Sequence, residues 1–209
     1  MLLVKTNGMS APPPARPRRR AISLSTETPE KLLCSRSDHS CDCAARAREK
    51  KGARSSIEAL LKRASGGREV GSINPLVDIY NTVSLTYALP CGGEDIDTFA
   101  GDLRLTVTQG GDAFRALGDE ADSETLPGEV CYLDDAGAVC RCWNWRDGVR
   151  TALSDDSADA FLAIECVEPE RMGDCQAAID RLAELLERYL GATVVVKTLV
   201  TRDNPRVEL

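Results

Sequence analysis

The stretch Ile-Asn-Pro-Leu-Val-Asp-Ile-Tyr-Asn at residues 73–81 predicts the beginning of a helix. Asn74 has a side chain suited to the N-cap, and Pro75 suits the first helical position because proline loses no hydrogen bond there. Apolar residues then recur at helical spacing as far as Tyr87, and Pro90 ends the run. The pattern therefore predicts a helix that begins at Pro75 and ends before Pro90.

This helix carries a polar stripe. Asn74, Asp78 and Asn81 stand at positions i, i+4 and i+7, so they share one face of the helix. Short polar groups need partners or a ligand when they are buried, and we interpret the stripe as part of a binding or catalytic site. The alternative is that Asn74 only caps the helix, while Asp78 and Asn81 are exposed to solvent.

Helices are expected towards both ends of the globular part, and strands in its middle. A Ser-Ser-Ile-Glu capping box at 55–58 opens a short helix that two glycines at 66–67 end, and a turn composition at 134–137 joins two strands into a hairpin. The other elements follow from apolar patterns: strands at 103–107, 130–133, 138–145, 160–167 and 193–200, and an amphipathic helix at 171–190. This order favours an α+β fold, a mixed sheet with packed helices, over a doubly wound parallel sheet.

The second strand of the hairpin would place candidate site residues on both of its faces. Alternation along this strand puts Trp143 and Trp145 on one face, and Asn144 and Arg146 on the other. Flat side chains beside an arginine suit a pocket wall that stacks on an amino-acid side chain or a base, so Trp145 and Arg146 are candidate substrate-binding residues. Asn144 with Arg146 is the alternative ligand-facing pair, and core packing is the alternative for the tryptophans.

Carboxylates after the glycine turn at 92–93 form a further group of candidates. Glu94 and Asp95 follow the two glycines, where a pair of carboxylates can bind an amino group or position a water molecule. An acidic pair at such a place also commonly caps the next element, which is the alternative interpretation. Glu129 and Tyr132 are weaker candidates for substrate binding.

Composition divides the chain near residue 54. Residues 1–53 combine prolines, an arginine run and a Ser/Thr/Glu-rich stretch without sustained periodicity, so we expect a disordered basic arm, followed by a single domain at 54–209. Residues 1–68 hold 15 Lys/Arg against 6 Asp/Glu, whereas residues 69–209 hold 11 against 27. Because an acidic domain attracts phosphates poorly, the arm is the expected source of attraction for RNA.

The residue types present exclude several kinds of catalytic site. The single histidine, His39, lies in the expected arm, which excludes a Ser/His/Asp or Cys/His unit from the domain. Three cysteines near it, at positions 34, 41 and 43, do not give a recognised zinc spacing, so we expect neither a metal nor another cofactor. No apolar run approaches the length of a membrane span and no export signal is recognisable, so a cytoplasmic protein is expected.

Several of these motifs resemble the tRNA-editing domain of the phenylalanyl-tRNA synthetase beta chain. Arg63 with Ser-Ile-Asn-Pro-Leu-Val-Asp-Ile-Tyr-Asn at 72–81 is similar to the helix that opens that domain. Motifs similar to those of free-standing relatives follow in order: Gly-Gly-Glu-Asp at 92–95, Gly-Asp-Leu-Arg-Leu-Thr at 101–106, Pro-Gly-Glu-Val at 127–130 and Arg-Cys-Trp-Asn-Trp-Arg at 141–146. The resemblance covers about residues 54–167, and Arg104, within one of these motifs, joins the candidate substrate-binding residues.

The resemblance implies hydrolysis of tRNA that carries the wrong amino acid. An aminoacyl ester is already activated, so a positioned water molecule is sufficient and no strong base is required. We therefore predict an editing deacylase that acts in trans on a mischarged aminoacyl-tRNA, with Asp78, Asn81 and Glu94 as catalytic residues and Asn74 among the substrate-binding ones. The alternatives are a module that binds tRNA or an amino acid without turnover, and an inactive or truncated paralogue.

Overall fold

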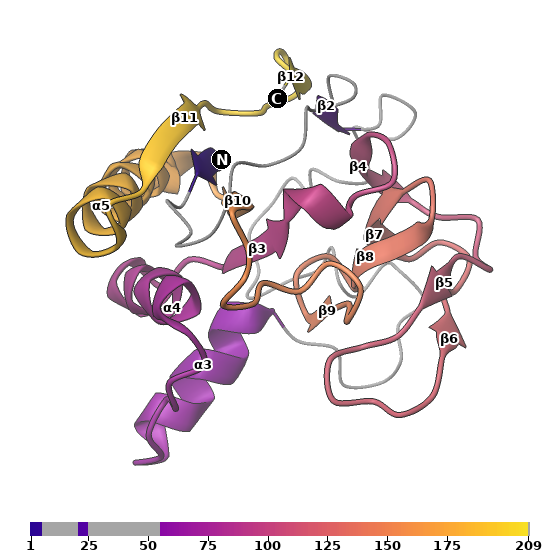
Figure 1. Cartoon of the computed structure of the whole chain (residues 1–209), viewed down its shortest axis with the longest axis horizontal. Coiled ribbons are helices and arrows are strands. Elements are labelled where there is room, and N and C mark those ends of the chain that lie inside the picture. Colours follow the sequence, from indigo (N-terminus) through magenta and orange to yellow (C-terminus); the bar gives the residue numbers. More distant parts are fainter. Residues whose placement is uncertain (6–20, 25–54, 209) are drawn as a thin grey trace.

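The computed structural model describes residues 1–5, 21–24 and 55–208, which form an α+β fold (Figure 1). The helices are α3 (Ser56–Ser65), α4 (Pro75–Tyr87) and α5 (Met172–Leu190), with short 3-10 turns η1 (Ile96–Thr98) and η2 (Pro169–Arg171). The strands are β1 (Leu2–Lys5), β2 (Ala21–Leu24), β3 (Cys91–Asp95), β4 (Leu103–Val107), β5 (Ala113–Phe114), β6 (Ser123–Glu124), β7 (Val130–Asp134), β8 (Gly137–Arg141), β9 (Arg146–Asp147), β10 (Asp159–Ile164), β11 (Thr193–Lys197) and β12 (Arg206–Glu208). The predicted fold class is confirmed.

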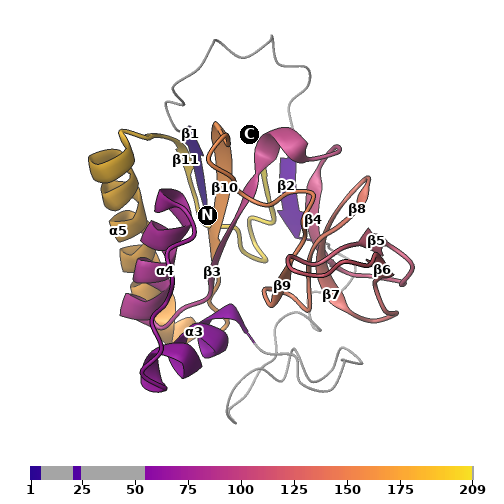
Figure 2. The same cartoon turned by 60° about the horizontal axis from the view of Figure 1, so that its bottom comes forward.

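Two sheets stack on each other, and helices cover one of them (Figure 2). The first sheet has the strand order β11-β1-β10-β3 and is antiparallel throughout. The second has the order β12-β2-β4-β7-β8-β9 and is mixed, because β2 and β4 run parallel. Helices α4 and α5 lie side by side on the outer face of the first sheet, and the second sheet packs on its inner face.

Strand β1 lies in the middle of the first sheet, between β10 and β11. Its side chains alternate between two cores: Leu2 and Val4 are fully buried against the helices, whereas Leu3 packs between the sheets. The prediction of a disordered arm at 1–53 is therefore wrong for residues 1–5 and 21–24, which form β1 and β2. A short strand buried on both faces has no alternation that would identify it in the sequence. The rest of the predicted arm, including His39 and its neighbouring cysteines, lies outside the described residues.

The helices begin and end where local signals predict. Ser55 caps α3 by accepting a hydrogen bond from the Glu58 N–H, and Asn74 caps α4 by accepting one from the Val77 N–H at 2.9 Å. Gly191 ends α5 at a φ of 59°, in the left-handed region that favours glycine. The predicted hairpin and the strands at 103–107, 160–167 and 193–200 are also present, with slightly different ends.

The second strand of the hairpin, β8, is shorter than predicted. It ends at Arg141, and Cys142 and Trp143 follow with φ values of 50° and 62°, in the left-handed region. The Trp143 N–H donates to the Val130 carbonyl at 2.7 Å and holds this turn against β7. The chain then comes back as β9 and pairs with β8. The predicted alternation of faces is therefore wrong beyond Arg141, because a turn replaces the extended backbone on which it depended.

Candidate active site

Two carboxylates of the first sheet face the space between the sheets. Glu94 on β3 lies opposite Phe161 on β10, and Phe161 packs in the core between the two sheets. Glu165 directly follows β10 and lies four positions after Phe161, an even offset, so it shares the same face. The Glu165 N–H donates to the Pro90 carbonyl at 3.0 Å, which extends the pairing of β10 and β3 as far as this residue.

Three side chains from other elements surround the Glu165 carboxylate. The Tyr132 hydroxyl, on β7, donates to one carboxylate oxygen at 2.6 Å, and the Asn144 amide donates to the other. Asn144 also accepts a hydrogen bond from the Ser56 N–H at the start of α3, at 3.1 Å. The Trp143 indole is close enough to lower the pKa of Glu165, although its buried N–H has no partner with hydrogen-bond geometry. The carboxylate is thus held in a fixed position by both sheets.

Burial raises the pKa of three acids in this space. It raises the pKa of Glu165 to about 7, although the hydrogen bonds from Tyr132 and Asn144 act in the opposite direction. It raises the pKa of Glu94 well above its usual range, and the nearby Asp147 carboxylate adds to this effect. The pKa of Asp147 is itself raised by burial. An acid whose pKa is close to neutral can give up or accept a proton at physiological pH, as general acids and bases do.

Open space lies beside Glu94 on the same face of β3. Gly92 precedes Glu94 by two residues, and a Cβ atom at Gly92 would meet no atom within 4 Å. At the neighbouring Gly93, by contrast, a Cβ atom would come within 2.4 Å of the Leu162 Cδ2 atom. One carboxylate oxygen of Glu94, Oε2, is buried without a hydrogen-bond partner. Room for a small side chain and an unsatisfied polar atom therefore occur two residues apart on one face of β3.

We name this group of residues the inter-sheet site. It consists of Glu94, Tyr132, Asn144, Asp147 and Glu165, and it lies where β3, β7, β9, the end of β10 and the turn after β8 meet. The structure thus brings together three residues that the sequence proposed for the site: Glu94, Tyr132 and Asn144.

Two members of the polar stripe organise the start of α4. Asn74 is the N-cap. Asp78 accepts hydrogen bonds from the Ser72 hydroxyl and from the Ile73 N–H, and both lower its pKa. Asn81 is half-buried and makes no hydrogen bond within the described residues. Only Asn81 therefore has polar atoms that local structure leaves unused.

Asp95 and Glu129 both hold loops in place. Asp95 caps η1 by accepting from the Asp97 N–H at 2.9 Å, and it also accepts from the Ser157 hydroxyl at 2.6 Å. Glu129 forms a two-pronged ion pair with Arg141, with both N–O distances at 2.9 Å. Both carboxylates are thus occupied by donors from this chain.

The remaining predicted residues lie in surface contacts. Arg104 pairs with Asp135 at 3.0 Å. Arg146 pairs with Asp119 at 2.7 Å, and its guanidinium lies 5.3 Å from the centre of the Trp145 ring. The structure therefore does not bring Arg104, Trp145 or Arg146 into hydrogen-bonding contact with the inter-sheet site.

Sequence reasoning missed two acids of this site, Glu165 and Asp147. Glu165 had a usable signal, because it is the one charged residue between Ala160 and Val167, in a run predicted to be an apolar strand. A carboxylate within such a run is either at the end of the strand or buried, and a buried one needs partners. Asp147 had no comparable signal, because its burial depends on the unpredicted turn before β9.

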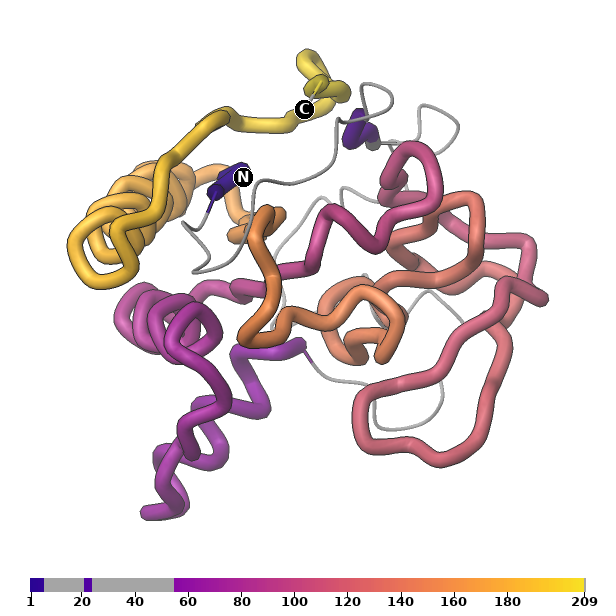
Figure 3. Tube along the Cα trace, in the orientation of Figure 1, coloured from indigo at the N-terminus to yellow at the C-terminus, as the bar shows by residue number. Residues whose placement is uncertain are grey.

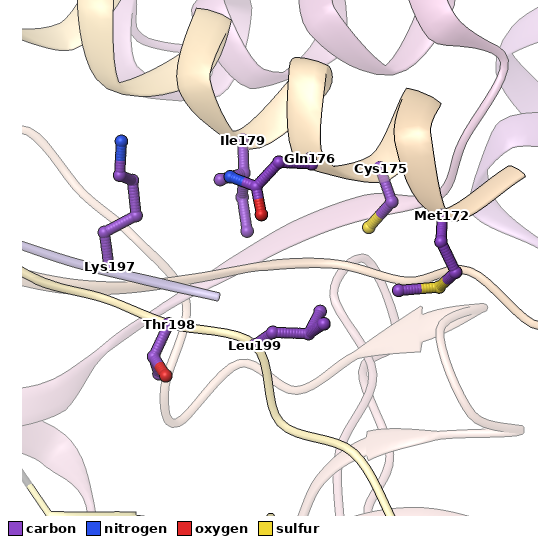
Figure 4. A pocket seen from close by; sticks show the side chains of 7 residues that line it. All are labelled: Met172, Cys175, Gln176, Ile179, Lys197, Thr198 and Leu199. Carbon is purple, nitrogen blue, oxygen red and sulfur yellow. The ribbon is translucent and has the colours of Figure 1, made fainter.

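A hollow of about 200 Å³ lies elsewhere, between α5 and β11 (Figure 4). None of the predicted site residues lines it, and Lys197 beside it is paired with Asp180 at 2.7 Å. Its lining is a mixture of apolar and polar side chains: Met172, Cys175, Gln176, Ile179, Lys197, Thr198 and Leu199. It offers no group of acids or bases comparable with the inter-sheet site.

Comparison with known proteins identifies the family. A family model described as the B3/4 domain matches residues 42–191, which is more than half of the 209 residues. The chain belongs to the B3/4 domain family. This is the domain type of the phenylalanyl-tRNA synthetase beta chain, so the resemblance noted in the motifs is confirmed. A comparison with curated proteins gave no match.

The matched part of this B3/4 domain contains the whole inter-sheet site. Strands β1, β2, β11 and β12 lie outside the match, although β1 and β11 are strands of the first sheet. None of the helices in the described residues has the length and apolar composition needed to cross a membrane.

The stability of this B3/4 domain should depend on pH through Glu165. The pKa of Glu165 is about 7 in the folded chain, against 4.5 for an ordinary glutamate, so the folded state retains a proton that the unfolded state releases between these values. Stability should therefore fall as pH rises through this window. Relative to Glu165→Gln, the wild type should lose roughly 2–4 kcal/mol between pH 5 and pH 8. Urea unfolding of both proteins at the two pH values measures this loss, and a constant difference would contradict it.

Proposed function

We propose that this B3/4 domain hydrolyses the ester of a mischarged aminoacyl-tRNA in trans, and that the inter-sheet site carries out the reaction. The observation that carries the proposal is the Glu165 carboxylate, which has a pKa of about 7 and is fixed by Tyr132 and Asn144. Family membership supports a module related to tRNA synthetases. It leaves open whether the module acts on the ester or only binds it.

In the proposed reaction, a water molecule attacks the ester carbonyl while the Glu165 carboxylate accepts a proton from it. The protonated Glu165 then gives this proton to the ribose oxygen as the bond from that oxygen to the carbonyl carbon breaks, so the ribose leaves as a hydroxyl and the free amino acid is released. Burial raises the pKa of Glu94 well above its usual range, which favours the protonated form, and in that form Glu94 would donate a hydrogen bond to the carbonyl oxygen. Asn81, whose amide is unused, is a candidate contact for the amino group of the substrate. No strong base is needed, because the ester is already activated.

The second candidate function is binding of an aminoacyl-tRNA end without turnover. The charge distribution favours it: residues 69–209 hold 11 Lys/Arg against 27 Asp/Glu, which is a weak attraction for a nucleic-acid substrate that must be bound and released repeatedly. Protection of the ester from spontaneous hydrolysis would identify this function, whereas acceleration would identify the deacylase.

The test of the proposal is hydrolysis of a panel of mischarged tRNAs by the purified full chain. We expect at least one aminoacyl class to be deacylated faster than in buffer. Gly92→Val should abolish this activity and leave folding intact, because the added side chain enters the open space beside Glu94. Gly71→Val is the matched control, since a Cβ atom there also meets no atom within 4 Å and Gly71 lies in the loop before α4. Full activity in Gly92→Val would place the reaction elsewhere.

A further inference from the structure

In the part of the chain that the structure describes, most lysines and arginines are paired with carboxylates. Ion pairs within 4 Å engage cations on both sheets and on α5. Within the described residues, the cations without an ion pair are Lys62, Arg63, Arg68, Arg188 and Arg202. The first three follow one another closely at the end of α3 and in the loop after it. We call Lys62, Arg63 and Arg68 the basic tip.

The basic tip is exposed on a part of the chain that projects from the fold. The tube in Figure 3 shows the end of α3 and the loop to α4 extending away from both sheets. All three side chains are exposed. Glu69 is the only acid between Ala59 and Val77, so the projection is positive while residues 69–209 as a whole are strongly acidic.

Helix electrostatics explain only part of this arrangement. Lys62 and Arg63 lie in the last turn of α3, where cations interact favourably with the helix dipole. Arg68 lies beyond the two glycines at 66–67 that end the helix, so the dipole gives no reason for its charge. Within the described residues no carboxylate pairs with these three side chains, so the cluster is available to an anionic partner.

Helix α3 connects the basic tip to the inter-sheet site. Its first residue, Ser56, donates its N–H to Asn144, which in turn holds Glu165. Ten residues of helix then span about 15 Å. A polyanion whose end lies at the inter-sheet site would therefore find the basic tip about one helix length away.

We propose that the basic tip binds the phosphate backbone of an RNA whose 3′ end reaches the inter-sheet site. The position of the 3′ end rests on the proposed function, whereas phosphate binding by the tip requires no hydrolysis. Charge complementarity supports an RNA. The acidic remainder of the domain repels phosphates, whereas the basic tip, among the described residues, is positively charged and can attract an RNA backbone.

The test uses full-length protein, deacylated tRNA and fluorescence anisotropy at several salt concentrations. Arg63→Gln/Arg68→Gln removes two charges from the tip. The matched control, Arg188→Gln/Arg202→Gln, removes two unpaired arginine charges elsewhere, so both variants have the same net charge. We expect the tip variant to weaken tRNA binding about tenfold at low salt and to reduce the slope of log K against log salt by about 2, with little change in the control.

The outcomes separate this proposal from the proposed function. A loss of tRNA affinity confined to the tip variant supports the proposal, whether or not esters are hydrolysed. Equal weakening in both variants overturns it, because net charge alone would then explain binding. It is also overturned if the tip variant keeps tRNA affinity but no longer binds vesicles of anionic lipid, to which the exposed Leu61 and Ile73 (42% and 72%) would also be suited. If the enzyme is active, the tip variant should hydrolyse a minimal aminoacyl-nucleotide at the wild-type rate.

Discussion

The double variant Leu2→Ala/Val4→Ala is expected to lose a large part of the stability of the domain. Both side chains are completely buried in the core between the first sheet and the helices, with relative solvent accessibilities of 0%. Replacing a buried leucine with alanine costs about 2–5 kcal/mol, because apolar contacts are lost and a cavity remains. With a smaller loss at Val4, the total is on the order of 5 kcal/mol, against a typical stability of about 5–15 kcal/mol.

Urea unfolding followed by circular dichroism measures this loss. Val195→Ala/Leu199→Ala is the matched control, because it removes the same atoms from residues that are 46% and 40% exposed on and beside the neighbouring strand β11. If the two double variants are equally stable, then β1 does not contribute to the core. Deletion of residues 1–53 is expected to be more damaging still, since it removes β1 and β2 and so breaks both sheets.

Glu165→Gln is expected to reduce ester hydrolysis by about 10²–10⁴-fold, the range typical of a lost general base. Glutamine has the same shape but cannot accept the proton of the attacking water. The variant should remain folded, because Glu165 is only half-buried and glutamine keeps its shape while removing a charge that desolvation makes costly. Glu168→Gln is the matched control: Glu168 is only three residues away but is exposed.

The pH dependence of hydrolysis gives an independent test of the same role. If the carboxylate form of Glu165 is active, the rate should rise with pH and reach half its maximum near pH 7. Tyr132→Phe removes a hydrogen bond that lowers this pKa, so the midpoint should move to higher pH. A rate that is independent of pH between 5 and 9, or a Glu165→Gln variant with full activity, would exclude Glu165 as the base.

Local signals predicted the helices and the hairpin well, because the interactions that define them join residues close together along the chain. The Asn74 cap involves a backbone N–H only three residues away, and Gly191 ends α5 through its own backbone conformation. The hairpin turn at 134–137 likewise joins neighbouring strands. Glu94, Tyr132 and Asn144, which the sequence proposed for the site, lie in or beside the motifs on which the resemblance rests.

Contacts between distant residues decided the rest. Strand β1 pairs with β10 and β11, which lie more than 150 residues away in the sequence. The sequence of residues 1–5 alone does not predict these partners. The ends of β8 and β9 depend on a turn that a strand pattern does not predict.

The sequence by itself therefore determined the fold class, the three helices and the family. Only the tertiary structure decided that β1 lies in the middle of the first sheet, and that Glu94, Asp147 and Glu165 share one space. The physical reason is that a helix cap is completed within one turn, whereas burial of a strand or a carboxylate is a property of the elements that pack around it.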